Sequence, residues 1–231
     1  MIFGIRAVIE AINAGKEIEK IFIRREMGGD LLKELFDLVQ ERKIPVQKVP
    51  LEKLNRLTTK NHQGVVAYIS SIEYQHIENI IPMLYEQGKD PFIVILDGVT
   101  DVRNFGAIAR TCECAGVDAI IMPMRGGAAA NADAVKTSAG ALHIIPVCRE
   151  NSLHNTVKVV AASEKASHLY SQADYSGPLA IVMGAEDVGI SPDILRIVDD
   201  MVSIPICGQI SSLNVSVATG VIVYEAVKQR R

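Results

Sequence analysis

The sequence has no apolar run long enough to cross a membrane. Its longest runs, such as 92–96 and 119–122, are far shorter than the roughly 20 residues that a membrane-spanning helix needs. The first residues, MIFGIR, also lack the basic stretch, the long apolar segment and the cleavage site of a secretory signal. We therefore expect a cytoplasmic protein.

Cysteine is scarce, and no two cysteines are spaced as a CxxC pair. The four are Cys112, Cys114, Cys148 and Cys207. This spacing gives no support for a zinc ribbon or a thioredoxin-like redox motif. We expect all four to be small apolar core residues, and we expect no metal site.

Positive charge is not in excess either. The chain has 24 lysines and arginines against 27 aspartates and glutamates, which gives a net charge of −3 and a pI near 6.0. Nonspecific polyanion binders are usually strongly basic, so any nucleic-acid site here must gather its positive charge locally. Hydrophobic residues make up 48% of the chain, which is enough for packed cores, and the length of 231 residues favours two domains.

The segment 1–72 alternates helical and strand-like patterns. Apolar residues at helical spacing predict a helix that ends near Gly15, and Asp30 is expected to cap a second helix. The expected helices are 5–15, 31–39 and 51–57, and the expected strands are 20–23, 46–49 and 65–69. This order predicts a compact α/β/α unit, followed by a polar, partly helical linker at 73–90.

The segment 91–231 has a different rhythm, in which strands alternate with helices. We expect strands at 92–97, 118–122, 143–147, 159–162, 179–183 and 201–204, and helices at 104–115, 131–138 and 213–229. This alternation predicts an α/β domain with a mostly parallel sheet. The connection 149–159 is short for a parallel crossover, so 151–158 has room for at most about two helical turns.

The segment 97–110, which begins where the first of these strands ends, is suited to hold a phosphate. Asn104 and Arg110 lie six residues apart near the start of the next helix. A helix start offers free backbone N–H groups and partial positive charge, and Arg110 adds a fixed cation. A plain N-cap with a surface arginine explains the same pattern, and the GxGxxG spacing of a Rossmann site is missing.

In the segment 181–191, an expected strand runs up to Gly184, and Glu186 follows two residues later. Gly184 has no side chain, which lets a ligand approach the backbone, and Glu186 lies just beyond the carboxyl edge where open α/β sheets bind ligands. The alternative is that Glu186 and Asp187 are solvated turn acids.

The segment 204–218 combines a strand end, a glycine-containing loop and a long apolar helix. Ser211 and Ser212 are placed to cap that helix, and Asn214 and Ser216 fall in its first turn. Side chains at such positions either cap the helix or reach a ligand.

Taken in order, the three segments resemble motifs 1, 2 and 3 of the SpoU/TrmH branch of the SPOUT methyltransferases. The matching residues are Asn104 and Arg110 in motif 1, Gly184 and Glu186 in motif 2, and Ile204, Ser212, Leu213 and Asn214 in motif 3. The runs ILDGVTDVRNFGAIAR, VMGAE and SSLNVSVATG are most similar to members that methylate a guanosine ribose in bacterial 23S rRNA. The runs FGIRAVIEAI and HQGVVA resemble that family's small RNA-binding domain of the ribosomal protein L30e type.

The resemblance implies an L30e-like RNA-binding domain at 1–72, a linker at 73–90 and a SPOUT α/β knot, a deep trefoil knot, at 91–231. It implies transfer of a methyl group from S-adenosylmethionine to a ribose 2'-hydroxyl, without a metal. Gly184, Ile204 and Leu213 would hold the donor. The residues implied to position the ribose and its phosphate are Asn104, Arg110, Glu186, Ser212 and Asn214.

Arginine is normally fully protonated, so we expect Arg110 to stabilise charge rather than to accept a proton, and the general base stays open. The final helix is apolar on most of its circumference, which predicts burial partly within the domain and partly in a homodimer. The resemblance also implies a dimer, in which Arg110 can reach the ribose bound by the other subunit.

Two alternatives remain at this point. One is a SpoU-type tRNA ribose methyltransferase, because the catalytic segments are shared across RNA substrates. The other is a noncatalytic RNA-binding protein. The intact set of Asn104, Arg110, Glu186 and Asn214 favours catalysis. Arg103 beside Asn104 and the short 149–159 connection depart from the family pattern without removing a motif residue.

Overall fold

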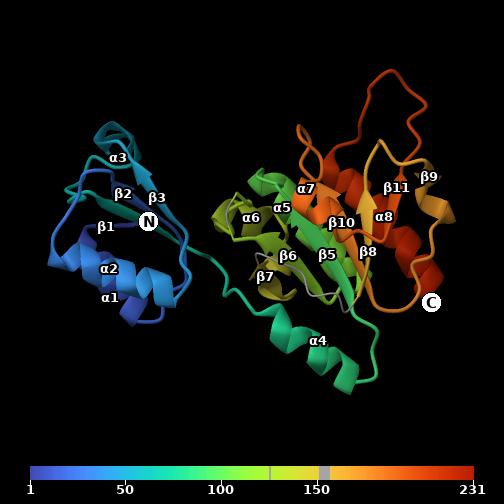
Figure 1. The fold of residues 1–231 in the computed structure, drawn as a ribbon, viewed down its shortest axis with the longest axis horizontal. Coiled ribbons are helices and arrows are strands. Elements are labelled where there is room, and N and C mark those ends of the chain that lie inside the picture. Colours follow the sequence, from blue (N-terminus) through green and yellow to red (C-terminus); the bar gives the residue numbers. More distant parts are fainter. Residues whose placement is uncertain (125, 151–156) are drawn as a thin grey trace. The chain divides into compact units, whose positions relative to one another are not determined.

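The chain folds into two compact units, each with its own sheet (Figure 1). The computed structural model describes residues 1–124, 126–150 and 157–231. The first unit is Met1–Glu73 and the second unit is Tyr74–Arg231. The short helix considered for 151–158 lies almost entirely outside the described residues. None of the described helices combines the length and apolarity needed to cross a membrane.

The first unit is a four-stranded sheet with helices on both faces. Its elements are β1 (Ile2–Phe3), α1 (Ile5–Asn13), β2 (Ile18–Arg24), α2 (Asp30–Glu41), β3 (Val46–Val49), α3 (Leu51–Leu57) and β4 (Val65–Ile69), with strand order β1-β4-β2-β3. Only the β2–β3 pair is parallel. Asp30 does not cap α2 as expected: it is the first helical residue, after Gly29, and makes no side-chain cap.

The two faces of this sheet are covered unequally. The helices α1 and α2 bury one face in a core that includes Val8, Ile21 and Leu35. The other face carries only α3 and a small buried group of Val49, Leu54 and Val66. Around this group lie half-buried aromatic rings.

The turn before β4 is tied together by His62. Its Nδ1 accepts the backbone N–H of Gly64 at 3.0 Å, so Nε2 carries the proton and donates to Asn55 Oδ1 at 2.9 Å. Gln63 and Gly64 both have left-handed backbone conformations, with φ of 49° and 81°. The HQG run therefore has a structural role, which is to join α3 to β4.

The second unit is a seven-stranded, fully parallel sheet with the order β7-β6-β5-β10-β8-β11-β9. Its strands are β5 (Phe92–Asp97), β6 (Ala119–Pro123), β7 (Val147–Glu150), β8 (Lys158–Ala162), β9 (His168–Leu169), β10 (Leu179–Gly184) and β11 (Asp200–Ser203). Its helices are α4 (Ile77–Glu86), α5 (Val102–Ala115), α6 (Ala132–Thr137), α7 (Pro192–Leu195) and α8 (Val215–Arg230). The mostly parallel α/β fold expected from the sequence is confirmed.

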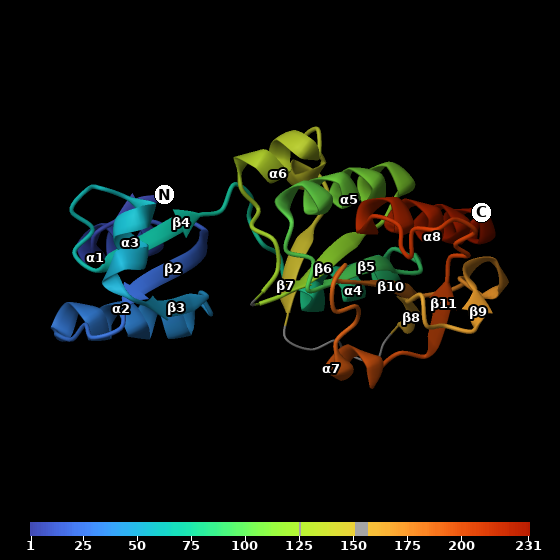
Figure 2. The same cartoon turned by 90° about the horizontal axis from the view of Figure 1, so that it is seen from above.

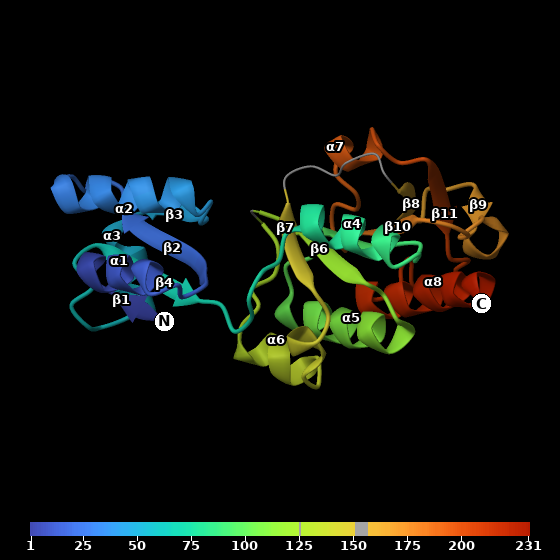
Figure 3. The ribbon, with the colours of Figure 1, turned by 90° about the horizontal axis from the view of Figure 1, so that it is seen from below.

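Helices cover both faces of this sheet, as parallel sheets require. Figures 2 and 3 show α5, α6 and α8 on one side and α4 and α7 on the other. The helix α4 lies in the stretch expected to be a linker, yet Ile77, Ile80 and Leu84 are buried against the sheet. Residues before β5 are therefore part of the second unit's core.

Two expectations about this unit were wrong. The apolar run 143–147 is not a strand, because Ala139 and Gly140 turn left-handed and Ala141–His143 forms a single 3₁₀ turn, so β7 starts only at Val147. Of the four cysteines, Cys112 and Cys148 are buried, but Cys114 and Cys207 are exposed. Burial and the nearby Glu150 raise the pKa of the Cys148 thiol to about 12.

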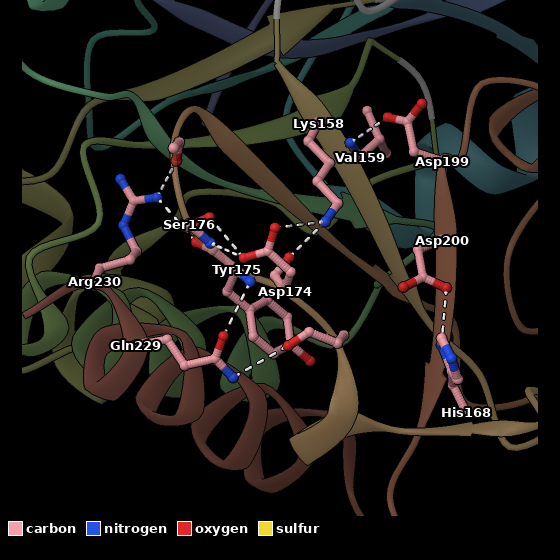
Figure 4. Close-up of polar contacts among 12 residues, drawn as sticks. Lys158, Val159, His168, Asp174, Tyr175, Ser176, Asp199, Asp200, Gln229 and Arg230 are labelled. Atoms are coloured by element: carbon pink, nitrogen blue, oxygen red, sulfur yellow. Dashed lines mark hydrogen bonds and ion pairs between the residues drawn. The ribbon is translucent and has the colours of Figure 1, made fainter.

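The end of α8 is fastened to the sheet by Gln229 and Arg230, which we call the α8 clamp (Figure 4). Arg230 donates to the backbone carbonyls of Asp90, Tyr175 and Gly177 and lies 4.9 Å from the ring centroid of Phe92. Gln229 accepts the N–H of Tyr175 and donates to the carbonyl of Ala173, both at 3.1 Å. The hydrogen-bond partners precede β5 and β10, so α8 runs along the strands from their carboxyl ends to their amino ends.

Candidate active site

The three polar segments meet where β5, β10 and β11 end. Gly184 pairs with Asp97 in the register of β10 and β5, so the first two segments leave the sheet side by side. The backbone N–H of Ser191 donates to the Asp97 carboxylate and ties the two together. Since ligands of open parallel sheets bind at this edge, the arrangement defines a candidate active site.

The start of α5 is capped by Asp101. Its Oδ1 accepts the backbone N–H groups of Arg103 and Asn104 at 2.9 and 2.8 Å. Two of the N–H groups that could receive a phosphate are therefore bound by a carboxylate, as in the N-cap alternative. Arg110 stays a candidate cation for a phosphate.

Glu186 joins the three segments through one oxygen atom. Its Oε1 accepts from Asn104 Nδ2 at 3.1 Å, from Asn214 Nδ2 at 3.0 Å and from the backbone N–H of Val215 at 3.2 Å. Asn214 Nδ2 also donates to Asn104 Oδ1 at 3.0 Å. The carboxylate thus lies at the start of α8, where the helix dipole favours negative charge. We call Asn104, Glu186 and Asn214 the amide–carboxylate cluster.

The amide oxygen and the amide nitrogen of Asn214 make different contacts. Its Oδ1 accepts the backbone N–H of Ser216 at 2.9 Å and so caps α8, while Nδ2 reaches Glu186 and Asn104. Ser211 and Ser212, which we expected to cap this helix, lie before it in the loop. Capping by Asn214 fixes its amide orientation, so the start of α8 and the cluster hold each other in place.

A cleft lies beside this cluster, with a volume of about 730 Å³ including space open to solvent. Gly184, Ile204 and Leu213 line it, as do Ser212 and Glu186. Its walls also include Ala162, Ser163, Glu164, Met183, Val202, Val215, Ala218 and Ile222. The cleft is therefore mostly apolar, with polar groups and strand ends at its edge, which is the usual character of a small-molecule site.

Gly184 is needed for a reason that we did not expect. A Cβ atom there would lie 2.5 and 2.7 Å from the backbone of Gly189, so the space is filled by the chain's own turn and not by a ligand.

The segment 162–164, which also lines the cleft, was not singled out from the sequence. A strand followed directly by Ser163 and Glu164 is the same pattern that singled out the other segments.

Arg110 does not join the cluster. Six residues along a helix rotate a side chain to about 120° from Asn104. Its side chain is exposed, and it has no hydrogen bond or ion pair to any residue that the structure describes. Arg110 is therefore a cation free to meet a group from outside this chain.

Gly106, between these two residues, sets the position of α5. A Cβ atom there would lie 2.6 Å from the carbonyl oxygen of Ala134 and 2.8 Å from Thr137 Cβ. Only glycine permits this close approach of α5 and α6.

Within 1–124, 126–150 and 157–231, no three histidine, cysteine or acidic side chains gather as metal ligands.

Comparisons with known proteins agree with this geometry. Residues 91–224 match the SpoU rRNA Methylase family, and residues 1–75 match the family described as RNA 2'-O ribose methyltransferase substrate binding. The chain is 36% identical to a putative TrmH family tRNA/rRNA methyltransferase of Staphylococcus saprophyticus, over 100% of this chain and 96% of that protein. It is 35% identical to the 23S rRNA (guanosine-2'-O-)-methyltransferase RlmB of Escherichia coli, over 100% and 98%.

Two solved structures are informative. The AdoMet-bound rRNA methyltransferase from Sinorhizobium meliloti matches 98% of this chain and 86% of its own, with a TM-score of 0.61 and 27% identity. The A. aeolicus TrmH/SpoU tRNA modifying enzyme matches 66% of this chain and 83% of its own, with a TM-score of 0.54 and 31% identity.

Proposed function

The chain belongs to the SpoU rRNA methylase family, and we propose that it transfers the methyl group of S-adenosylmethionine to the 2'-hydroxyl of a guanosine ribose in 23S rRNA. The observation that carries this proposal is the amide–carboxylate cluster, which three distant segments build beside an apolar cleft. The relatives named for this reaction match the chain from end to end.

The cleft suits the methyl donor. Apolar side chains such as Ile204 and Leu213 can enclose an adenine ring, and the strand ends at Ala162 and Gly184 offer backbone groups for its polar edge. When bound, S-adenosylmethionine supplies a methyl group on a positively charged sulfur atom. We assign donor binding to Gly184, Ile204 and Leu213.

The amide–carboxylate cluster would orient the ribose. Glu186 Oε1 fixes the amides of Asn104 and Asn214 before any substrate arrives, so little reorganisation is needed on binding. Ser212 lies at the cleft, where its hydroxyl can contact the same sugar. The guanidinium of Arg110 would stabilise the adjoining phosphate and the developing alkoxide.

The choice of rRNA over tRNA rests on the first unit. The tRNA modifying enzyme from A. aeolicus resembles only 66% of this chain, whereas the rRNA methyltransferase RlmB aligns with all of it. Residues 1–75 match a substrate-binding family. We infer that this unit selects the rRNA and that the enzyme works in the cytoplasm, together with its substrate.

The test is methyl transfer to purified RNAs. Labelled S-adenosylmethionine should mark 23S rRNA from a strain that lacks the gene, and ribose-methylation mapping should find one guanosine. Label in tRNA with none in rRNA, or label on a base, would disprove the proposal.

We further propose that the active form is a homodimer. The helix α8 is not buried on every side by its own unit: Val217 and Tyr224 remain 52% and 49% exposed. They lie seven residues apart on the same side of the helix, with half-buried Val221 between them. A partner on this strip, together with the free cation Arg110, would let one subunit act on the ribose held by the other.

The homodimer is tested by sedimentation and by mixing. Sedimentation at low micromolar concentration should show a dimer, and mixing the inactive variants Arg110→Ala and Asn214→Ala should restore part of the activity. A fully active monomer would contradict the dimer, and a dimer without restored activity would contradict only the shared site.

The deep trefoil knot stays a prediction of the resemblance.

A further inference from the structure

We propose that the face of the first unit's sheet that carries α3 binds unpaired RNA nucleotides, with bases stacked on aromatic rings and phosphates held by lysines. This inference rests on the proposed function, because it names the surface that would hold the rRNA. We call this surface the aromatic–lysine face. It consists of Phe3, Phe22 and Tyr68 with Lys20, Lys53 and Lys60.

The aromatic–lysine face is open because α3 is too short to cover it. Seven residues of helix span about 10 Å, whereas four strands span roughly 15 to 20 Å across the sheet. The helix buries Leu54 against the strands and leaves the three rings half-buried around it. The opposite face has two longer helices and a larger buried core.

The strand register brings these side chains together. Phe22 lies opposite Val66, which in turn lies opposite Phe3, and Lys20 lies opposite Tyr68. The rings of Phe22 and Tyr68 meet edge to face, with centroids 6.1 Å apart. Flat apolar rings held in fixed positions on a sheet are platforms on which bases of any sequence can stack.

The lysines lie over the same rings. Lys20 Nζ and Lys53 Nζ are 5.0 and 5.2 Å from the centroid of Phe22, and Lys60 Nζ is 5.4 Å from that of Phe3. Two ammonium groups therefore converge on one ring. Their ring contacts are favourable, but their mutual repulsion is not.

This repulsion acts on the pKa of Lys20. Partial burial and then the charge of Lys53 lower the pKa of Lys20, and Glu19 only partly offsets them. A phosphate between the two ammonium groups would relieve this repulsion. RNA carries one phosphate beside each base, so it fits a surface that alternates rings and cations.

The charge of the two units favours RNA over a protein partner. The first unit has 12 lysines and arginines against 10 aspartates and glutamates, a net charge of +2, while the second unit has 12 against 17, a net charge of −5. The chain is acidic as a whole, and the first unit is the one with a positive net charge.

The experiment compares charge changes on the two sides of the first unit's sheet in the full-length protein. Lys20→Glu with Lys53→Glu alters the aromatic–lysine face, and Lys48→Glu is the control on the opposite side. Lys48 also lies over a ring, 5.5 Å from the centroid of Phe36, but on the side of α2. The probe is a single-stranded fragment of 23S rRNA, followed by fluorescence anisotropy over a range of salt concentrations.

The double variant should bind the probe at least tenfold more weakly, with the salt slope reduced by about 2, because two phosphate contacts are lost. Lys48→Glu should bind like the unchanged protein, and all three should bind S-adenosylmethionine equally. An unchanged affinity in the double variant, or an equal loss in Lys48→Glu, would overturn the proposal. So would equal binding of the same fragment as a duplex.

Ultraviolet cross-linking gives a second readout that does not depend on stability. Unpaired bases stacked on the rings should form cross-links to Phe22 or Tyr68, located by mass spectrometry. Cross-links confined to α1 or α2 would contradict the assignment. If the protein methylates no rRNA yet loses RNA binding in the double variant, the proposed function fails and this surface stands.

Discussion

The two units differ in net charge and in the side chains that they bring together. The first presents cations over aromatic rings and carries a net charge of +2, whereas the second carries −5 and builds its site from two amides and one carboxylate. A strongly basic site would bind RNA at any position. Placing the ring-bound lysines in one unit and the amide–carboxylate cluster in the other lets RNA affinity and reaction be tuned independently.

The largest effect is expected at Asn104. Asn104→Asp keeps the size of the side chain but sets a second carboxylate against Glu186 Oε1, so repulsion should open the cluster. We expect kcat to fall by about 10²- to 10³-fold. Affinity for S-adenosylmethionine should stay unchanged, because Asn104 is not among the residues that line the cleft.

Arg110→Ala should lower kcat similarly while leaving calorimetric cofactor affinity intact. Lys228→Ala is the control, since Lys228 is an exposed cation that pairs with Glu225 near the far end of α8. Lost cofactor affinity in either site variant would mean that donor and ribose sites are not separate.

A smaller effect is expected from removing the first unit. A chain of residues 74–231 keeps α4, whose Ile77, Ile80 and Leu84 cover the sheet, so it should fold and bind S-adenosylmethionine. Its RNA affinity should fall by at least about tenfold, because the phosphate contacts are gone. Equal RNA binding by the short and full chains would show that the second unit holds the RNA itself.

A still smaller difference is expected between two glycines of the second unit, Gly184 and Gly220, when each is replaced by alanine. Gly184→Ala would force a Cβ atom against the backbone of Gly189 and should cost about 1–3 kcal/mol of stability. Gly220→Ala, inside α8, meets only Thr111 Cγ2 at 3.7 Å and should stabilise the helix by up to about 1 kcal/mol. Thermal unfolding would measure both, and equal changes would contradict the crowding at Gly184.

The smallest effect concerns the exposed thiols. Alkylation should modify Cys114 and Cys207 and spare Cys148, whose raised pKa keeps it protonated. S-adenosylmethionine should slow the reaction of Cys207 alone, since this residue follows Ile206 in the cleft wall. Equal protection of Cys114 would point to a general change in the unit instead.

Sequence patterns predicted the elements whose apolar periodicity is strong. The parallel sheet, α1 and α5 follow from runs such as 92–97 and from helical spacing. The strand expected at 143–147 failed because its apolar residues are indistinguishable from a strand until the left-handed turn at Ala139 and Gly140 is known.

The site was predicted as a set of residues but not as an arrangement. Nothing in the sequence shows that one oxygen of Glu186 accepts from groups 82 and 28 residues away. Local patterns also misassigned the cap of α8, because Ser211 and Ser212 are good caps in isolation while Asn214 alone can also reach Glu186. Contacts of this kind depend on the order of strands in the sheet.

The α8 clamp, formed by Gln229 and Arg230, affects the order in which the chain can fold while it is being made. Domains fold in order as a chain is made, beginning at the N-terminus. The first unit is complete in sequence at Glu73, whereas the amide–carboxylate cluster needs Asn214. The helix α8 is held only once Gln229 and Arg230 reach the residues before β5 and β10, which are made earlier. With the proposed RNA surface in the first unit, a growing chain would hold RNA well before it could modify it.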